Sequence, residues 1–228
     1  MQETFIIFST ENAFELSCKL ATPCKKTAPH IWDLGPEWRE KWEIDRSEIH
    51  KGRELGRGNY GIVYYGKWAQ FEVAVKTLKK NSMSPEAFLK EAAIMKDFRH
   101  KNLISLYAIC SNDEPIYIVQ EYMSKGSLLD FLRSEQGALL KFEELVCFAA
   151  QIASGMEYLE SKQLVHGGLA ARNVMIGENN VVKICDFGLA RVVADDDFYT
   201  KQGSECPVKW TAPEAIGFGR FSIKSDVW

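Results

Sequence analysis

The chain has 228 residues, of which 46% are hydrophobic and 26% charged, and its formal net charge at pH 7 is −3; this is an ordinary globular composition, which excludes collagen-like and disordered chains. The weak negative charge gives no basic surface for nucleic acid, and no apolar run approaches the length of a transmembrane helix. The six cysteines include no Cys-x-x-Cys pair, so we expect reduced, mostly buried thiols in a cytosolic protein rather than a zinc site or disulfides.

Residues 1 to 48 show neither a helical nor a strand period, and Pro23, Pro29 and Pro36 interrupt them. We therefore expect a linker here. The exception is a short alternating segment, Leu16-Ser17-Cys18-Lys19-Leu20, which could form a half-buried strand.

A glycine-rich turn follows, with the spacing Gly-x-Gly-x-x-Gly in Gly56, Gly58 and Gly61, between Leu55 and Val63. A dinucleotide-binding fingerprint has this spacing but joins a strand to a helix. Here both flanks, residues 60 to 68 and 71 to 78, have the aromatic, branched and alternating pattern of strands. Because glycine lets backbone amides approach phosphate groups, we interpret the turn as a lid over a nucleotide triphosphate.

A helix is predicted to begin at Ser84-Pro85, where a hydroxyl cap precedes a proline in the first turn. Glu91 falls on the apolar stripe of this helix, which is formed by Phe88, Ala92 and Met95. A carboxylate on a buried face needs a cation, and Lys76, in the middle of the preceding strand, needs an anion. We expect these two to pair and to aim the lysine at phosphates; the alternative is a glutamate that reaches solvent.

Further strands are predicted at 103 to 109 and 116 to 120, and two short ones at 174 to 176 and 181 to 185. Between these pairs, one helical face is predicted to be buried for four turns, through Leu145, Phe148, Ala149, Ile152, Met156 and Leu159.

This helix leads into His166-Gly167-Gly168-Leu169-Ala170-Ala171-Arg172-Asn173, and Asp186-Phe187-Gly188 follows thirteen positions after Asn173. The two segments resemble the catalytic loop and the metal-binding motif of protein tyrosine kinases. In that family the second and third residues of the loop are arginine and aspartate, and here both are glycine.

The resemblance covers residues 53 to 228, and the Src-related branch is indicated by Ala170-Ala171-Arg172, Pro207-Val208-Lys209-Trp210 and Trp42-Glu43-Ile44-Asp45-Arg46. It implies an α+β, two-lobe kinase fold, with a small antiparallel β lobe at 49–119 and an incomplete helical lobe at 120–228. Residues 1–48 would hold the linker and, at Leu16 to Cys24, the last strand of a phosphotyrosine-binding Src homology domain. Ser225-Asp226-Val227-Trp228 would open a long central helix.

The resemblance also implies roles for individual residues, with ATP and magnesium as cofactors and protein tyrosine as the substrate. Lys76 and Glu91 would position the phosphates, Asn173 and Asp186 would hold magnesium, and Arg172 would belong to the catalytic loop. The nucleotide would be held by Leu55, the three glycines, Val63, Ala74 and Met175, and by backbone groups of Glu121 and Met123. Gln120 would narrow the pocket behind the adenine, and Tyr199 would be the phosphosite of the activation segment. An internal stack of Met95, Leu106, His166 and Phe187 would be anchored by Asp226.

Three departures from the family change the expected function. Gly168 removes the general base, Gly167 removes an arginine that receives phosphate, and Glu205-Cys206 alters the peptide-binding loop. General acid-base assistance is worth about a hundred- to ten-thousand-fold in rate. Two functions stay open, an impaired ATP-dependent tyrosine kinase and a pseudokinase that signals through nucleotide or partner binding. A nucleotide-free scaffold is the third alternative. We expect a cytoplasmic monomer, with any contact to the membrane made by regions outside this chain.

Overall fold

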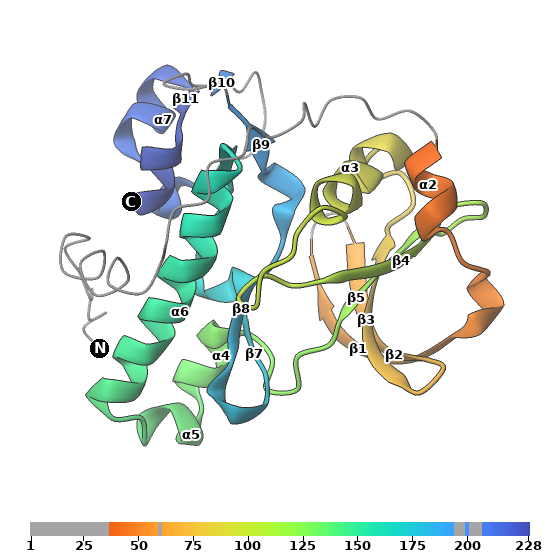
Figure 1. The fold of residues 1–228 in the computed structure, drawn as a ribbon, viewed down its shortest axis with the longest axis horizontal. Coiled ribbons are helices and arrows are strands. Elements are labelled where there is room, and N and C mark those ends of the chain that lie inside the picture. The colour runs from red at the N-terminus through yellow and green to blue at the C-terminus, as the bar shows by residue number, and fades with distance from the viewer. Residues whose placement is uncertain (1–36, 59–60, 194–198, 201–206) are drawn as a thin grey trace.

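The computed structural model describes residues 37–58, 61–193, 199–200 and 207–228. Its first half forms a five-stranded antiparallel sheet with the strand order β1-β2-β3-β5-β4, on the right in Figure 1. The strands are β1 Ile49–Arg57, β2 Gly61–Trp68, β3 Phe71–Leu78, β4 Leu106–Cys110 and β5 Tyr117–Glu121. The α+β class predicted from the sequence is confirmed.

The helix α3, Pro85–Met95, begins as its sequence predicts, with the Ser84 side chain accepting a hydrogen bond from the Ala87 N–H. Its buried face packs with Leu106, Ile118 and Phe187 in one apolar cluster. In register, Lys76 on β3 lies between Val63 of β2 and Ile118 of β5. The central strand therefore carries the lysine toward the helix that carries Glu91.

The segment before the sheet differs from the expected linker. Helix α2, Glu37–Trp42, and the 3-10 helix η1, Arg46–Glu48, lie against the sheet. Both carboxylate oxygens of Glu43 accept hydrogen bonds from Ser111, from its N–H and from its hydroxyl, each at 2.6 Å. Six residues make too short a window for a helical period to stand out, and the stabilising partner is distant in the sequence. The predicted strand at Leu16 lies outside the described residues.

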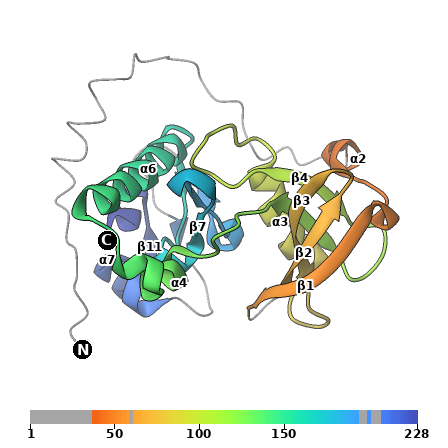
Figure 2. The same ribbon diagram turned by 90° about the horizontal axis from the view of Figure 1, so that it is seen from below.

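The second half contains α4 Leu128–Arg133, α5 Glu135–Ala138, α6 Phe142–Ser161 and α7 Pro213–Phe218. Short strand pairs join these helices: β6 Leu164–Val165 with β9 Arg191–Val192, β7 Val174–Ile176 with β8 Val182–Ile184, and β10 Tyr199–Thr200 with β11 Arg220–Phe221. The chain crosses between the two halves after β5, as Figure 2 shows.

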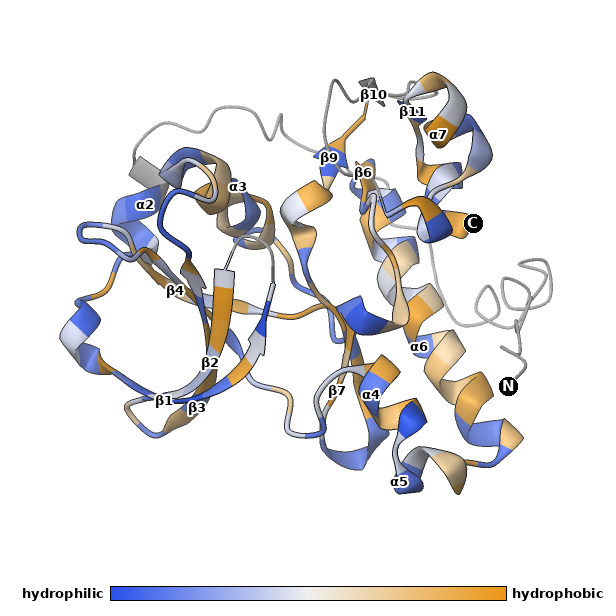
Figure 3. Ribbon diagram, turned by 180° about the vertical axis from the view of Figure 1, so that it is seen from behind, coloured by the Kyte–Doolittle hydropathy of each residue, from blue (hydrophilic) through white to orange (hydrophobic). Residues whose placement is uncertain are grey.

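Helix α6 is less buried than its sequence predicts. Phe148 and Leu159 are buried, but Leu145, Ile152 and Met156 are only half-buried. Within the described residues the core covers one side of this helix, and Figure 3 shows apolar residues along its length. The expected buried stripe is therefore wider than the surface that the described residues cover.

The end of the chain differs from expectation, whereas the thiols of the described residues are free and mostly buried, as predicted. Residues Ile223–Val227 form a 3-10 helix, η6, instead of the opening of an α-helix. Of the cysteines in the described residues, Cys147 is exposed, whereas Cys110 and Cys185 are buried. Burial raises the pKa of the Cys110 thiol to about 11. No helix in the described part of the chain is long and apolar enough to cross a membrane.

Candidate functional site

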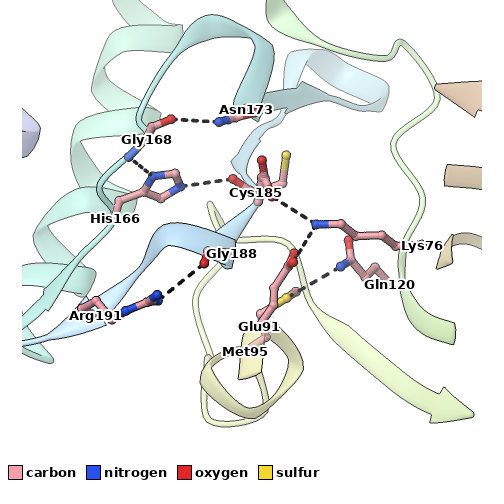
Figure 4. Close-up of polar contacts among 11 residues, drawn as sticks. Lys76, Glu91, Met95, Gln120, His166, Gly168, Asn173, Cys185, Gly188 and Arg191 are labelled. Carbon is pink, nitrogen blue, oxygen red and sulfur yellow. Dashed lines mark hydrogen bonds and ion pairs between the residues drawn. The ribbon is translucent and has the colours of Figure 1, made fainter. Parts of the chain in front are cut away.

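The site is centred on Lys76, which β3 brings to two carboxylates. Its Nζ lies 2.6 Å from Glu91 Oε2 on α3 (Figure 4). It also lies 3.1 Å from Oδ1 of Asp186, which follows β8. The predicted pair of Lys76 and Glu91 is therefore present, and the alternative of a glutamate in solvent is excluded, because the Glu91 side chain is only 5% exposed. The lysine joins the neighbouring elements β3 and α3 to the segment after β8, which is 110 residues away in the sequence.

The charges of these groups depend on one another. Burial alone would lower the pKa of Lys76, but the carboxylates of Glu91 and Asp186 outweigh it and hold that pKa above its ordinary value. Burial raises the pKa of Glu91, and the Lys76 ammonium opposes this shift. The same ammonium holds the pKa of Asp186 below its ordinary value. Lys76 is thus a fixed positive charge that keeps Asp186 ionised.

Asp186 has a left-handed backbone, with φ 66° and ψ 70°. This conformation costs a residue other than glycine about 1–2 kcal/mol, so the surrounding structure must hold it. The next residue, Phe187, does so: it is fully buried, with its ring centroid 4.8 Å from that of Phe98 and 5.2 Å from that of His166. Burial of Phe187 leaves the Asp186 side chain 49% exposed and able to take a ligand.

Hydrogen bonds hold the loop from His166 to Asn173 at both ends. The N–H groups of His166 and Gly167 donate to the two carboxylate oxygens of Asp226, at 2.6 and 2.8 Å. The Asn173 amide donates to the Gly168 carbonyl oxygen at 2.8 Å, as Figure 4 shows. The loop is therefore fixed although two of its residues are glycine. No hydrogen bond from another described residue occupies the Asn173 side-chain oxygen.

The two glycines of this loop have different backbones. Gly167 has φ 71°, the left-handed region that side chains disfavour. Gly168 does not, and a Cβ built on it would meet Leu189 at 3.4 Å, an ordinary contact. A side chain could therefore be added at 168 without rearranging the loop.

The glycine turn is open where a ligand would approach. A Cβ on Gly56 or Gly58 would meet no atom within 3.4 Å, whereas a Cβ on Gly61 would collide with the Thr77 carbonyl oxygen. The Gly58 N–H donates to the Gly61 carbonyl oxygen at 2.9 Å and closes the turn. Position 61 must therefore be glycine for β2 to pair with β3, whereas Gly56 and Gly58 leave open space around the turn.

The backbone groups predicted to read an adenine differ in their availability. The Glu121 N–H already donates to the Ser105 carbonyl oxygen at 3.0 Å, so this N–H is not free for a base. The Met123 N–H is bonded to no backbone carbonyl of the described residues. Val63, Ala74 and Met175 are half-buried on β2, β3 and β7, and Leu55 is on β1.

This arrangement can be compared with known proteins. Residues 49–228 match the family described as protein tyrosine and serine/threonine kinase. The chain belongs to this protein kinase family. It is 65% identical over 227 residues to Tyrosine-protein kinase Src64B of Drosophila melanogaster, covering 99% of this chain and 41% of that protein. It is 52% identical over 219 residues to Tyrosine protein-kinase src-1 of Caenorhabditis elegans, covering 93% of this chain and 41% of the relative.

These relatives confirm the predicted resemblance to Src-related non-receptor tyrosine kinases. The chain spans about two fifths of the length of each relative. Protein kinases generally use ATP and magnesium, and the site described above lies within the matched region.

Some residues singled out from the kinase resemblance have unexpected neighbours. The Arg172 guanidinium lies over the Trp210 ring, 4.3 Å from its centroid. Tyr199 pairs through its backbone with Phe221, and nothing is described of its side chain. Glu205 and Cys206 lie outside the described residues.

Among the ion pairs that the sequence did not predict, one joins the two halves of this kinase domain. Lys183 Nζ on β8 lies 2.7 Å from Glu121 Oε1 on β5, and both side chains are mostly buried. Lys183 alternates with the buried Val182 and Ile184, which shows that it points away from their side of the strand. That pattern gives no sign of a partner 62 residues away.

Proposed function

We propose that this chain is a kinase domain that binds magnesium ATP through Lys76, Asn173 and Asp186 and transfers phosphate to protein tyrosine only slowly, because position 168 has no base. The observation that supports this most strongly is the assembled group of Lys76, Glu91 and Asp186 next to a loop that is held in place but lacks a side chain at 168. The positioning parts are present and the proton acceptor is not.

The residues fit a magnesium nucleotide. The described residues contain no group of three or more His, Cys, Asp or Glu side chains that could hold a metal by themselves. Magnesium is usually bound by one or two carboxylates together with substrate phosphates, and it prefers oxygen ligands. Asp186 supplies an exposed carboxylate, and Asn173 has a side-chain oxygen opposite the amide that bonds to Gly168. Bound magnesium would neutralise phosphate charge, and Lys76 would hold the phosphates.

The rate lost through the missing side chain at 168 has an expected range. Phosphoryl transfer depends mostly on positioning and on charge neutralisation, so it can proceed without a base. A missing base removes about a hundred- to ten-thousand-fold of rate, which is roughly 3–5 kcal/mol of barrier. We therefore place the chain between an active kinase and a pseudokinase. The pseudokinase alternative is favoured by the same glycine, and it differs in having no measurable transfer.

Nucleotide binding is tested by calorimetry on the 228-residue chain, with and without magnesium. We expect magnesium-dependent ATP binding that Lys76→Met abolishes. Lys96→Met is a matched control, since the Lys96 side chain is 21% exposed, against 20% for Lys76, and pairs with Asp97 rather than with the site. Equal ATP affinity of the wild type and Lys76→Met, or no binding by folded wild type, would rule the proposal out.

A further inference from the structure

One oxygen of Glu91 is left without a partner. Glu91 Oε2 holds Lys76, but Oε1 is buried and makes no hydrogen bond in the structure. An unsatisfied polar atom is costly in a protein interior, and more so when it belongs to a charged group. This second oxygen therefore calls for a donor that can reach it.

A suitable donor close to this part of α3 is the side-chain amide of Gln120, on β5. Its Nε2 lies 3.8 Å from Met95 Sδ, as Figure 4 shows. Met95 is four residues after Glu91 on α3, so the two side chains lie on the same face of the helix. The Gln120 amide thus points to the part of α3 that carries the unpaired oxygen.

As an acceptor for the Gln120 amide, the Glu91 carboxylate is favoured over the Met95 thioether. A methionine sulfur is a weak acceptor, whereas a hydrogen bond to a carboxylate is about twice as strong as one between neutral groups. A glutamine amide has two N–H donors, and its terminal torsion is broad, so a small rotation can serve both acceptors. Burial is the main influence and raises the pKa of the Glu91 carboxyl, while the Lys76 ammonium and the nearby Gln120 amide act in the opposite direction.

We propose that Gln120 is a positioning residue whose side-chain N–H donates to Glu91 Oε1, so that the Glu91 carboxylate is held at both oxygens while it orients Lys76. This inference rests on the proposed function, because the lysine is oriented toward nucleotide phosphates. It assigns to Gln120 a role different from narrowing the pocket behind an adenine. With Glu91 held from both sides, Lys76 can turn toward phosphates without the carboxylate following it.

The bond itself is tested without nucleotide, by NMR of the side-chain amides in protein labelled with nitrogen-15 at glutamine. The Gln120 signal is assigned by its loss in Gln120→Met. We expect its two protons to exchange with water at least about tenfold more slowly than those of exposed Gln70. Glu91→Gln should shift the Gln120 signal and speed its exchange, whereas Met95→Leu should change it little. A signal that responds to Met95→Leu and not to Glu91→Gln would overturn the proposal, and so would fast exchange in the wild type.

The positioning role is tested by magnesium ATP affinity. We expect Gln120→Met to weaken it by about tenfold, the loss of one hydrogen bond to a charged group. Gln70→Met makes the same change in the exposed turn between β2 and β3 and should leave affinity unchanged. Equal affinity of Gln120→Met and the wild type would overturn the positioning role. If the wild type bound no nucleotide, the proposed function would fall and the positioning role with it, while the NMR signals would still decide whether the bond exists.

Discussion

Two adjacent glycines have different physical reasons for being tolerated. Gly167 adopts φ 71°, where an L side chain is strained, and it donates its N–H to Asp226 at 2.8 Å. Gly168 has no such conformation and has room for a Cβ. The loss of a base that we propose at 168 would therefore be purely chemical, whereas 167 is a position where glycine suits the backbone.

Alanine at the two positions should show this difference. We expect Gly167→Ala to reduce the free energy of unfolding by about 1–2 kcal/mol, the cost of a left-handed backbone. Gly168→Ala should change it by less than about 0.5 kcal/mol, because it introduces only an ordinary contact. Urea unfolding of both variants measures this. Equal losses would show that the two backbones are alike.

The roles of single residues were predictable to different degrees. The pair of Lys76 and Glu91 followed from two opposite charges on buried faces of neighbouring elements, and the structure brings them together at 2.6 Å. The strained backbone of Asp186 and the pair of Glu121 and Lys183 could not be predicted, because both depend on contacts between residues distant in sequence. The roles proposed for Arg172 and Tyr199 stay predictions.

Strong local signals placed the elements well. Strand β3 and strand β7 have the predicted bounds, and α3 begins at its predicted cap. Helix α2 was missed, because it is short and is held by a tertiary contact rather than by its own sequence. The exposed part of α6 was overestimated as core, since periodicity shows which face is apolar but not what covers it.

The contact that holds α2 against the sheet can be tested by itself. Glu43 accepts two hydrogen bonds from Ser111, at the end of β4. We expect Glu43→Ala to lower the free energy of unfolding by about 1.5–3 kcal/mol, because it removes bonds to a charged group and leaves the Ser111 donors unpaired. Glu40→Ala, in the exposed part of α2, is the control and should change it by less than about 0.5 kcal/mol. A similar loss in both variants would mean that the contact adds no stability.

At the scale of the whole molecule, the site depends on both halves of the chain. Lys76 and Glu91 come from the sheet and α3, while Asp186 and Asn173 come from the segments around β7 and β8. The two-lobe organisation was predictable because the motifs have a fixed order along the chain. The burial of α6 was not predictable in the same way, because it depends on what covers the half-buried face of this helix.

We propose that the chain keeps the nucleotide-binding parts of a kinase and that its rate of phosphoryl transfer is lowered by the glycine at position 168. The most direct measurement is tyrosine phosphotransfer to a peptide by a chimera in which this chain replaces the matched region of Src64B, with glycine or aspartate at 168. Gly168→Asp should raise the rate by at least about a hundredfold while magnesium ATP affinity stays the same. Equal rates in the two chimeras would contradict the proposed function, because they would show that the side chain missing at 168 does not limit transfer.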